Sequence, residues 1–259
     1  MIKAGLCSVC FKPKAPEEVI ELAKKVGLSA IEWIGSVHVP AGDVRTAEEV
    51  GKMARDAGLI STYGSIFHLG TGEDITPHLS SAAALGARDM RIWAGNGKPS
   101  CDMTSEERRA FVEEAKDASR RAAELGIKLS VECHDGGLTD CAESQLRFLR
   151  EVDEENFCTY WQEILNLPES AHLPSLSAVH TSGKLTNIHV YQYRVFDGGR
   201  EMLPLSDGFE KWRERFDILK GDDTEHLALI EYVRNYTEDI LAEDAKTLCA
   251  LIKASSVIS

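Results

Sequence analysis

Short runs of apolar, β-branched and aromatic residues alternate with longer helical patterns eight times along this sequence of 259 residues. Successive runs begin about one strand–helix unit apart, which is the spacing of parallel strands joined by helical crossovers. Eight such units without a break in composition predict one closed (β/α)8 TIM barrel rather than an open doubly wound sheet. We therefore expect residues 1–259 to form a single barrel domain, a fold that usually takes roughly 250 residues.

The expected strands and helices follow from these patterns. Strands are predicted over residues 3–7, 30–34, 60–66, 89–93, 128–133, 156–161, 185–191 and 226–233. Helices are predicted over residues 16–26, 47–57, 77–85, 105–125, 141–151, 173–180, 208–219 and 237–253. Pro168 and Pro174 are expected to interrupt any long helix within residues 164–181.

Composition and charge exclude several classes of protein. The net charge is −13, from 42 acidic and 29 basic residues, whereas nucleic-acid binders usually carry a basic excess. No G-x-G-x-x-G follows the first expected strand, so the usual dinucleotide fingerprint is missing. No apolar run approaches the ~20 residues of a membrane span. The start, MIKAGLCSVC, has one lysine and too short an apolar stretch for a signal peptide. We expect a cytoplasmic protein without nucleic-acid or membrane partners.

Metal-capable side chains stand at the ends of four consecutive expected strands. Alternation places Glu132 and His189 on the inward face of the fifth and seventh strands, while Glu231 ends the apolar eighth strand and Gln162 ends the sixth. Catalytic groups of parallel barrels lie at these carboxyl ends. Each residue alone could instead be an ordinary buried polar group satisfied by hydrogen bonds.

Two carboxylates that face each other inside a barrel repel, and a cation between them relieves that repulsion. Carboxylate oxygens, an amide oxygen and an imidazole nitrogen together suit Mn²⁺, Mg²⁺, Co²⁺ or Zn²⁺. The sequence thus predicts one divalent-metal site built from Glu132, Gln162, His189 and Glu231.

The chain resembles the xylose-isomerase-like TIM barrels, and within them the sugar and sugar-phosphate isomerases and epimerases. The resemblance rests on the order and spacing of four segments: GLSAIEW at 27–33, LSVECHDG at 129–136, IHV at 188–190 and ALIEY at 228–232. It implies that Glu132 and Glu231 bind the metal and act as the acid/base pair, with His189 as a further ligand. Where this family usually has an aspartate followed by a histidine on the sixth strand, the chain has Gln162 and Leu165.

Further residues near the predicted mouth are candidates for substrate binding. The family often has an arginine that holds a terminal substrate oxygen near the position of Arg194, although a surface arginine in a loop is an equal alternative. Aromatic and polar side chains that could contact a sugar are Glu32, His38, His68, Trp93 and His134. Cys7 and Cys10 have C-x-x-C spacing on a strand without a second ligand pair, which favours core packing.

The resemblance implies a metal-dependent isomerase or epimerase that works on a small sugar-like carbonyl substrate through an enediolate. A metal-dependent lyase or dehydratase on a polyhydroxy acid is an alternative, because both reactions begin with proton removal beside a carbonyl. A non-catalytic carbohydrate-binding barrel with a degenerate site is another. A DNA-repair endonuclease of similar fold is disfavoured by the acidic charge, and a homo-oligomer is compatible with the sequence.

Overall fold

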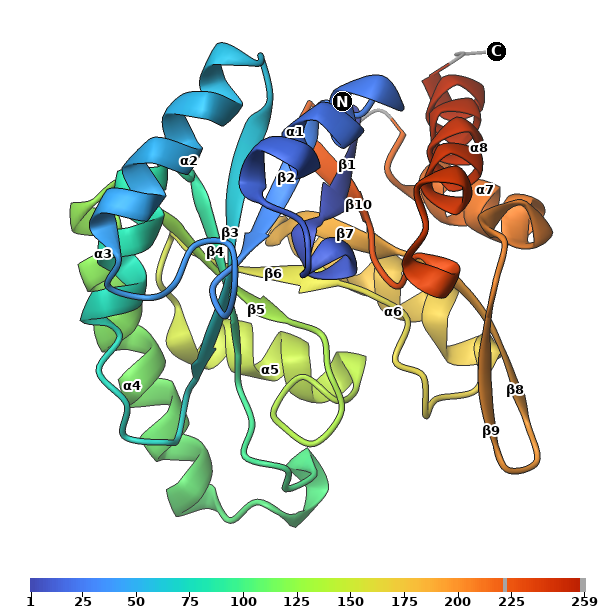
Figure 1. Ribbon diagram of the computed structural model, residues 1–259. Coiled ribbons are helices and arrows are strands. Elements are labelled where there is room, and N and C mark those ends of the chain that lie inside the picture. The colour runs from blue at the N-terminus through green and yellow to red at the C-terminus, as the bar shows by residue number, and fades with distance from the viewer. Residues whose placement is uncertain (221–222, 257–259) are drawn as a thin grey trace.

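A computed structural model describes residues 1–220 and 223–256, and eight parallel strands in these residues close into a barrel (Figure 1). The predicted fold class is therefore confirmed. Neighbouring strands follow the order β1-β10-β7-β6-β5-β4-β3-β2 around the barrel. Their bounds are β1 Ile2–Cys7, β2 Ala30–Ile34, β3 Ile60–His68, β4 Asp89–Trp93, β5 Lys128–Glu132, β6 Phe157–Trp161, β7 Leu185–Val190 and β10 His226–Ile230.

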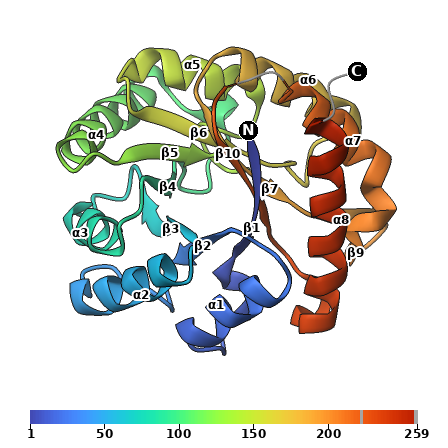
Figure 2. The ribbon, with the colours of Figure 1, turned by 90° about the horizontal axis from the view of Figure 1, so that it is seen from above.

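Helices surround the barrel as an outer layer (Figure 2). Within residues 1–220 and 223–256 they are α1 Pro16–Lys25, α2 Val44–Asp56, α3 Thr76–Leu85, α4 Ser105–Glu124, α5 Ala142–Val152, α6 Glu169–Thr181, α7 Phe209–Ile218 and α8 Glu238–Ser256. Local signals explain several ends: Thr104 and Glu107 form a capping box at α4, and Gly86 follows α3 in the left-handed conformation. None of the described helices has the length and apolar character of a membrane crossing.

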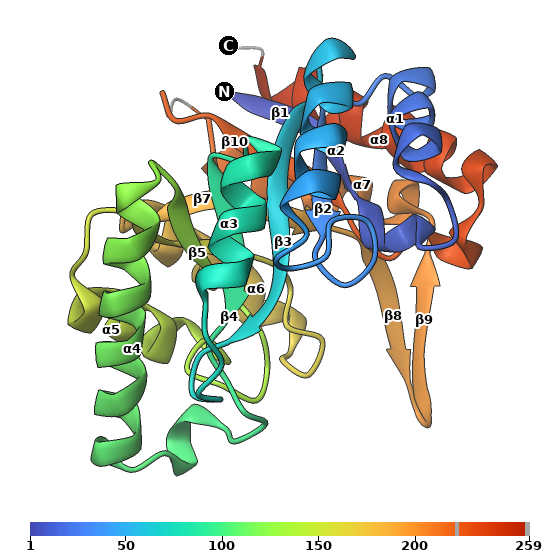
Figure 3. The same ribbon diagram turned by 60° about the vertical axis from the view of Figure 1, so that its left-hand side comes forward.

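The segment after β7 differs from the loop expected around Arg194. It forms an antiparallel hairpin of β8 Gln192–Phe196 and β9 Gly199–Leu203, which projects away from the barrel (Figure 3). The turn between the strands is Asp197-Gly198, and Gly198 has a φ of +97°. Asp-Gly between alternating strands is a strong hairpin signal because its backbone twist matches that of the strands.

The helix after β6 is longer than the prolines led us to expect. Pro168 precedes α6 as its N-cap, and the helix continues through Pro174 to Thr181. Leu176 and Val179 are fully buried on this helix. Burial of this apolar face outweighs the hydrogen bond that a proline removes from the helix interior.

The barrel interior combines a small apolar cluster with buried polar groups. Cys7, Ala30, Tyr160, Leu227 and Leu229 form a cluster separate from the large core between sheet and helices. A polar network crosses the interior at the start of β4. In it, Ser130 Oγ lies 2.8 Å from Asp89 Oδ2 and 2.9 Å from Thr186 Oγ1.

Asp89 makes the stability of the fold depend on pH. Burial raises the pKa of this carboxyl to about 7, whereas an unfolded aspartate titrates near ~4. The folded state therefore binds the extra proton between about pH 4 and 7, and stability falls as pH rises through this window. We expect Asp89→Asn, which keeps an oxygen for Ser130, to flatten that decline in urea-unfolding free energies measured from pH 4 to 8. Equally steep declines in both proteins would contradict this assignment.

Candidate metal and active site

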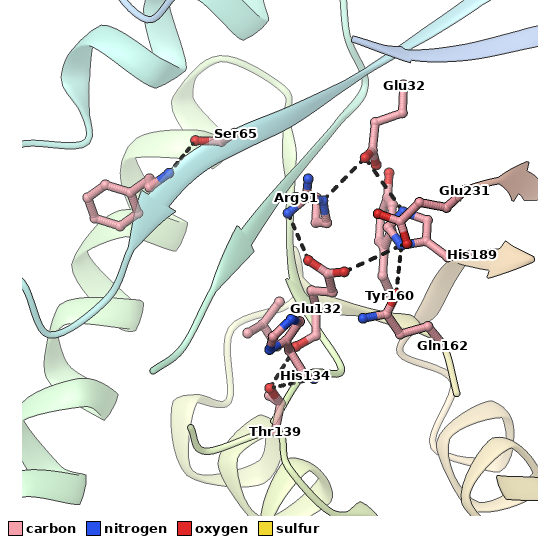
Figure 4. A network of polar contacts seen from close by, with 12 residues as sticks. Glu32, Ser65, Arg91, Glu132, His134, Thr139, Tyr160, Gln162, His189 and Glu231 are labelled. Atoms are coloured by element: carbon pink, nitrogen blue, oxygen red, sulfur yellow. Dashed lines mark hydrogen bonds and ion pairs between the residues drawn. The ribbon is translucent and has the colours of Figure 1, made fainter. Parts of the chain in front are cut away.

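Six charged or metal-capable side chains meet where the barrel strands end (Figure 4). Each comes from a different element: Glu32 from β2, Arg91 from β4, Glu132 from β5, Gln162 from just after β6, His189 from β7 and Glu231 from just after β10. All are buried apart from Glu231, whose side chain is 12% exposed. The period of two along each strand points these side chains inward and leaves the apolar alternates to the helices.

A single ring nitrogen lies at the centre of the predicted ligand set. His189 Nδ1 lies 3.1 Å from Gln162 Oε1, 3.4 Å from Glu132 Oε1 and 3.4 Å from Glu231 Oε2. The imidazole is fully buried, and its edge-to-face contact with the Tyr160 ring fixes its plane. The structure thus brings together the four residues that the sequence proposed as ligands.

These distances fit the coordination sphere of one divalent ion. Bonds of about 2.2 Å at right angles separate neighbouring ligand atoms by about 3.1 Å, which is close to the spacing around His189 Nδ1. Among the described residues, Glu231 Oε2 is buried without a hydrogen-bond partner. An unpartnered buried carboxylate oxygen is costly unless a cation satisfies it. The donor set therefore suits a hard divalent ion.

Arg91 is a central residue of the site that the sequence reasoning missed. Its Nη1 lies 2.8 Å from Glu132 Oε2, and its Nε lies 3.3 Å from Glu32 Oε1. The guanidinium also packs over the Trp93 ring at 4.4 Å. The signal was available, because Arg91 stands between Asp89 and Trp93 on the same inward face of a buried strand.

Arg91 gives the two candidate acid/base glutamates, Glu132 and Glu231, different pKa values. Burial by itself would raise the pKa of Glu132, but the charges of Arg91 and His189 lower it to about 2. Burial raises the pKa of Glu231 to about 7, and the neighbouring Glu132 charge adds to this effect while His189 opposes it. Glu231 is therefore the carboxylate with the greater affinity for a proton.

A cavity of about 490 Å³ opens beside this cluster, between the segments that follow β4 and β5. Small-molecule sites usually fall in this range of volume. Three predicted substrate-binding residues line it: His68, Trp93 and His134. The rings of His68 and Trp93 stack at 4.6 Å. A Cβ on Gly95 would lie 2.5 Å from the carbonyl oxygen of Gly136, so a side chain there would push the two cavity walls apart.

The other three predicted substrate contacts lie elsewhere. His38 is buried with both ring nitrogens engaged, at 2.9 Å from Ser8 Oγ and 3.1 Å from the Lys14 carbonyl, so it is neither a solvated loop residue nor free for a sugar. Arg194 sits on the exposed hairpin and pairs with Glu201 at 2.7 Å. Glu32 contacts Arg91 and His189 in the ion-pair cluster and, like Glu132 and Glu231, does not line the cavity.

A second group with metal-like spacing is already neutralised by cations. Ligand atoms of Glu163, Glu169 and His172 lie within 4.8 Å of one another. However, Glu163 is fully buried, with its two oxygens 2.9 Å from Lys211 Nζ and 2.6 Å from Arg215 Nη2. These ion pairs tie the end of β6 to α7, and thereby fix the backbone next to Gln162.

The sequence is similar to a known family of barrels and to a characterised relative. A family model described as xylose isomerase-like TIM barrel matches residues 20–251. A 3-dehydroshikimate dehydratase of Bacillus anthracis is 24% identical over 273 residues, covering 95% of this chain and 96% of the relative.

Solved structures share the fold over nearly the whole chain. The crystal structure of the probable 3-DHS dehydratase AsbF, involved in petrobactin synthesis in Bacillus anthracis, has a TM-score of 0.80 at 22% identity and covers 96% of this chain and 99% of its own. A D-psicose 3-epimerase from Clostridium cellulolyticum H10 has a TM-score of 0.70 at 16% identity, with 98% and 100% covered.

Two arginines allow a matched test of the buried ion-pair cluster. Replacing Arg91 by methionine leaves Glu32 and Glu132 buried without their cation, which typically costs ~3–5 kcal/mol of unfolding free energy. Arg194→Met removes an exposed ion pair of similar length and should leave stability almost unchanged. Urea unfolding of both variants without added metal measures the difference. Similar stabilities would show that the Arg91 cluster does not support the fold.

Proposed function

Because the chain belongs to the xylose isomerase-like TIM barrel family, we propose that it is a divalent-metal-dependent enzyme. In this proposal it removes a proton from a carbon beside the carbonyl of a small polyhydroxylated substrate. One observation carries the proposal: three oxygens from Glu132, Gln162 and Glu231 surround a single buried nitrogen of His189. Such convergence of mixed oxygen and nitrogen donors is characteristic of Mn²⁺, Mg²⁺, Co²⁺ or Zn²⁺ sites.

When bound, the ion would hold adjacent substrate oxygens and stabilise the negative charge that develops on the carbonyl oxygen. The protein supplies a matching charge. Two carboxylates, Glu132 and Glu231, balance a divalent ion, while Gln162 and a neutral His189 add no charge. Arg91 contacts both Glu32 and Glu132. The three carboxylates would therefore face the two charges of the ion and the one charge of Arg91, so the buried mouth as a whole carries no large uncompensated charge.

Glu231 is the residue best placed to remove the substrate proton. Both oxygens of Glu132 are engaged, one by Arg91 at 2.8 Å and the other facing His189 at 3.4 Å. The side chain of Glu231 is 12% exposed, whereas that of Glu132 is 4% exposed. A base must reach the proton it abstracts, so Glu231 carries this step and Glu132 orients the substrate.

A site with one competent base favours elimination over epimerisation. Glu231 takes the proton from the carbon beside the carbonyl, the electron pair forms a double bond, and the hydroxyl on the next carbon leaves with a proton as water. The relatives named dehydratases support this reaction class, with 24% identity in sequence and a TM-score of 0.80 in structure. We therefore place a lyase first and suggest a 3-dehydroshikimate-like hydroxy-carbonyl acid as its substrate.

The isomerase or epimerase expected from the sequence is the second candidate. It is favoured by the approach of Glu132 and Glu231 to the same nitrogen, since two-base epimerisation uses carboxylates on both sides of the substrate. In either reaction Trp93, His68 and His134 line the space for the substrate.

Isotope exchange distinguishes the two candidates. In D₂O with saturating Mn²⁺, we expect 3-dehydroshikimate to lose water and unreacted substrate to gain deuterium beside its carbonyl. Glu231→Gln should slow exchange by at least ~10²-fold, and Glu132→Gln should slow it less. Deuterated epimers of ketohexoses, with both variants equally impaired, would instead indicate the epimerase. No reaction with either substrate class would favour the carbohydrate-binding barrel.

Gln162 provides a separate test of the ligand set. Gln162→Asp replaces a neutral oxygen by a charged one and should tighten Mn²⁺ binding, roughly tenfold, because affinity rises with the number of charged ligands. Gln162→Ala should weaken it. Isothermal titration of the wild type and both variants with Mn²⁺ measures these changes. Equal affinities in all three proteins would show that Gln162 does not contact the ion.

A further inference from the structure

His189 has a second ring nitrogen that the proposed metal site leaves unused. Nε2 is buried and has no hydrogen-bond partner among residues 1–220 and 223–256. The nearest acid on this side is Glu32, whose Oε1 lies 3.5 Å away. Glu32 Oε2 is likewise buried without a hydrogen bond in this part of the chain. A potential donor and a carboxylate acceptor thus face each other on the side away from the proposed ion.

If Nδ1 of His189 binds the ion, the other ring nitrogen must carry a proton and needs an acceptor. A ring that coordinates an ion through Nδ1 is neutral and carries its one remaining proton on Nε2. A buried N–H without an acceptor is costly. Ligand histidines in proteins almost always donate this second N–H to a carboxylate, a backbone carbonyl or water, which fixes the tautomer and the orientation of the ring.

We propose that Glu32 is a positioning residue that accepts the Nε2–H of His189 and thereby holds Nδ1 toward the ion. This inference rests on the metal site of the proposed function. It also replaces the expectation that Glu32 contacts the substrate, because the carboxylate is only 3% exposed and lies behind the imidazole.

Arg91 connects Glu32 to the proposed metal ligand Glu132. The same guanidinium lies 3.3 Å from Glu32 and 2.8 Å from Glu132. Its positive charge favours the ionised form of Glu32, which is the form that accepts a hydrogen bond. Gly64 leaves room for the pair, because a Cβ there would lie 2.8 Å from Glu32 Oε1 and 3.0 Å from Arg91 Nη2. Glu132, Arg91, Glu32 and His189 thus form one continuous chain of contacts.

A metal ion bound by Cys7, Glu32 and His189 Nε2 is the main alternative to a hydrogen bond between Glu32 and His189. Ligand atoms of Cys7, Glu32 and His189 lie within 4.8 Å of one another, a spacing that a thiophilic ion could also use. However, the Arg91 cation already contacts Glu32, and a metal ion bound between Glu32 and Cys7 would be repelled by this neighbouring guanidinium. The geometry therefore favours an acceptor over a second metal position.

Titration with Mn²⁺ tests the proposal on the whole protein. We expect Glu32→Gln, an isosteric change that replaces the charged acceptor by a weaker neutral one, to weaken Mn²⁺ binding by about 10- to 100-fold, as for other carboxylates that orient ligand histidines. Cys7→Ala is the control and should leave the affinity close to that of the wild type. An unchanged affinity in Glu32→Gln would overturn the positioning role. A loss in Cys7→Ala equal to that in Glu32→Gln would place the ion on the Cys7 side and also overturn it.

Nitrogen NMR of the wild type can identify the tautomer of His189 directly. In ¹⁵N-labelled protein loaded with diamagnetic Zn²⁺, we expect the ion on Nδ1 and a hydrogen-bonded proton on Nε2. In Glu32→Gln that proton should exchange faster, while the backbone amide spectrum stays the same, which a purely structural effect would not produce. A wild-type Nε2 without a proton would refute the inference. A wild type that binds neither Mn²⁺ nor Zn²⁺ would instead refute the proposed metal site itself.

Discussion

Compensation of buried charge is the constraint on which the mouth of this barrel depends. Glu32, Glu132 and Glu231 approach one imidazole, and only Arg91 among the contacting side chains is a permanent cation. Carboxylates removed from water destabilise a fold unless an opposite charge lies nearby. Arg91 contacts Glu32 and Glu132, and its one positive charge balances only one of the three carboxylates. The remaining negative charge requires a protonated histidine or a metal ion. The position of one guanidinium thus decides which carboxylate oxygens have no fixed positive charge beside them.

The closed barrel makes this concentration of charge possible. Six of the eight barrel strands deliver side chains to one end, while apolar residues such as Leu229 and Tyr160 fill the interior. The parallel hydrogen-bond registers hold each strand at a fixed height, so residues at equivalent positions converge without any contribution from flexible loops. Ion pairs such as Glu163 with Arg215 then fix the strand ends against the outer helices.

Much of this arrangement could be predicted from the sequence, because periodicity determines which face a residue occupies. Strands 30–34 and 89–93 match the structure to the residue, and inward parity brought Glu132 and His189 together. The alternation of inward and outward residues does not give the partners of a side chain, so the contacts of Glu32 with Arg91 and His189 were not expected. Arg91 was not predicted because metal donors were expected at strand ends, whereas this counter-charge lies within β4. The hairpin was missed although Asp197-Gly198 signals it.

Arg91 contacts Glu132 but not Glu231, and this difference in proton affinity affects which reactions the barrel can support. Two equivalent carboxylates on either side of a substrate suit epimerisation, because each must give or accept a proton. A guanidinium bound to only one of them lowers the proton affinity of that carboxylate and leaves a single effective base. Elimination needs no more than one base, since the proton removed from carbon can leave with the hydroxyl. In this chain the contact that makes the two carboxylates unequal comes from β4, which neighbours the strand that carries Glu132.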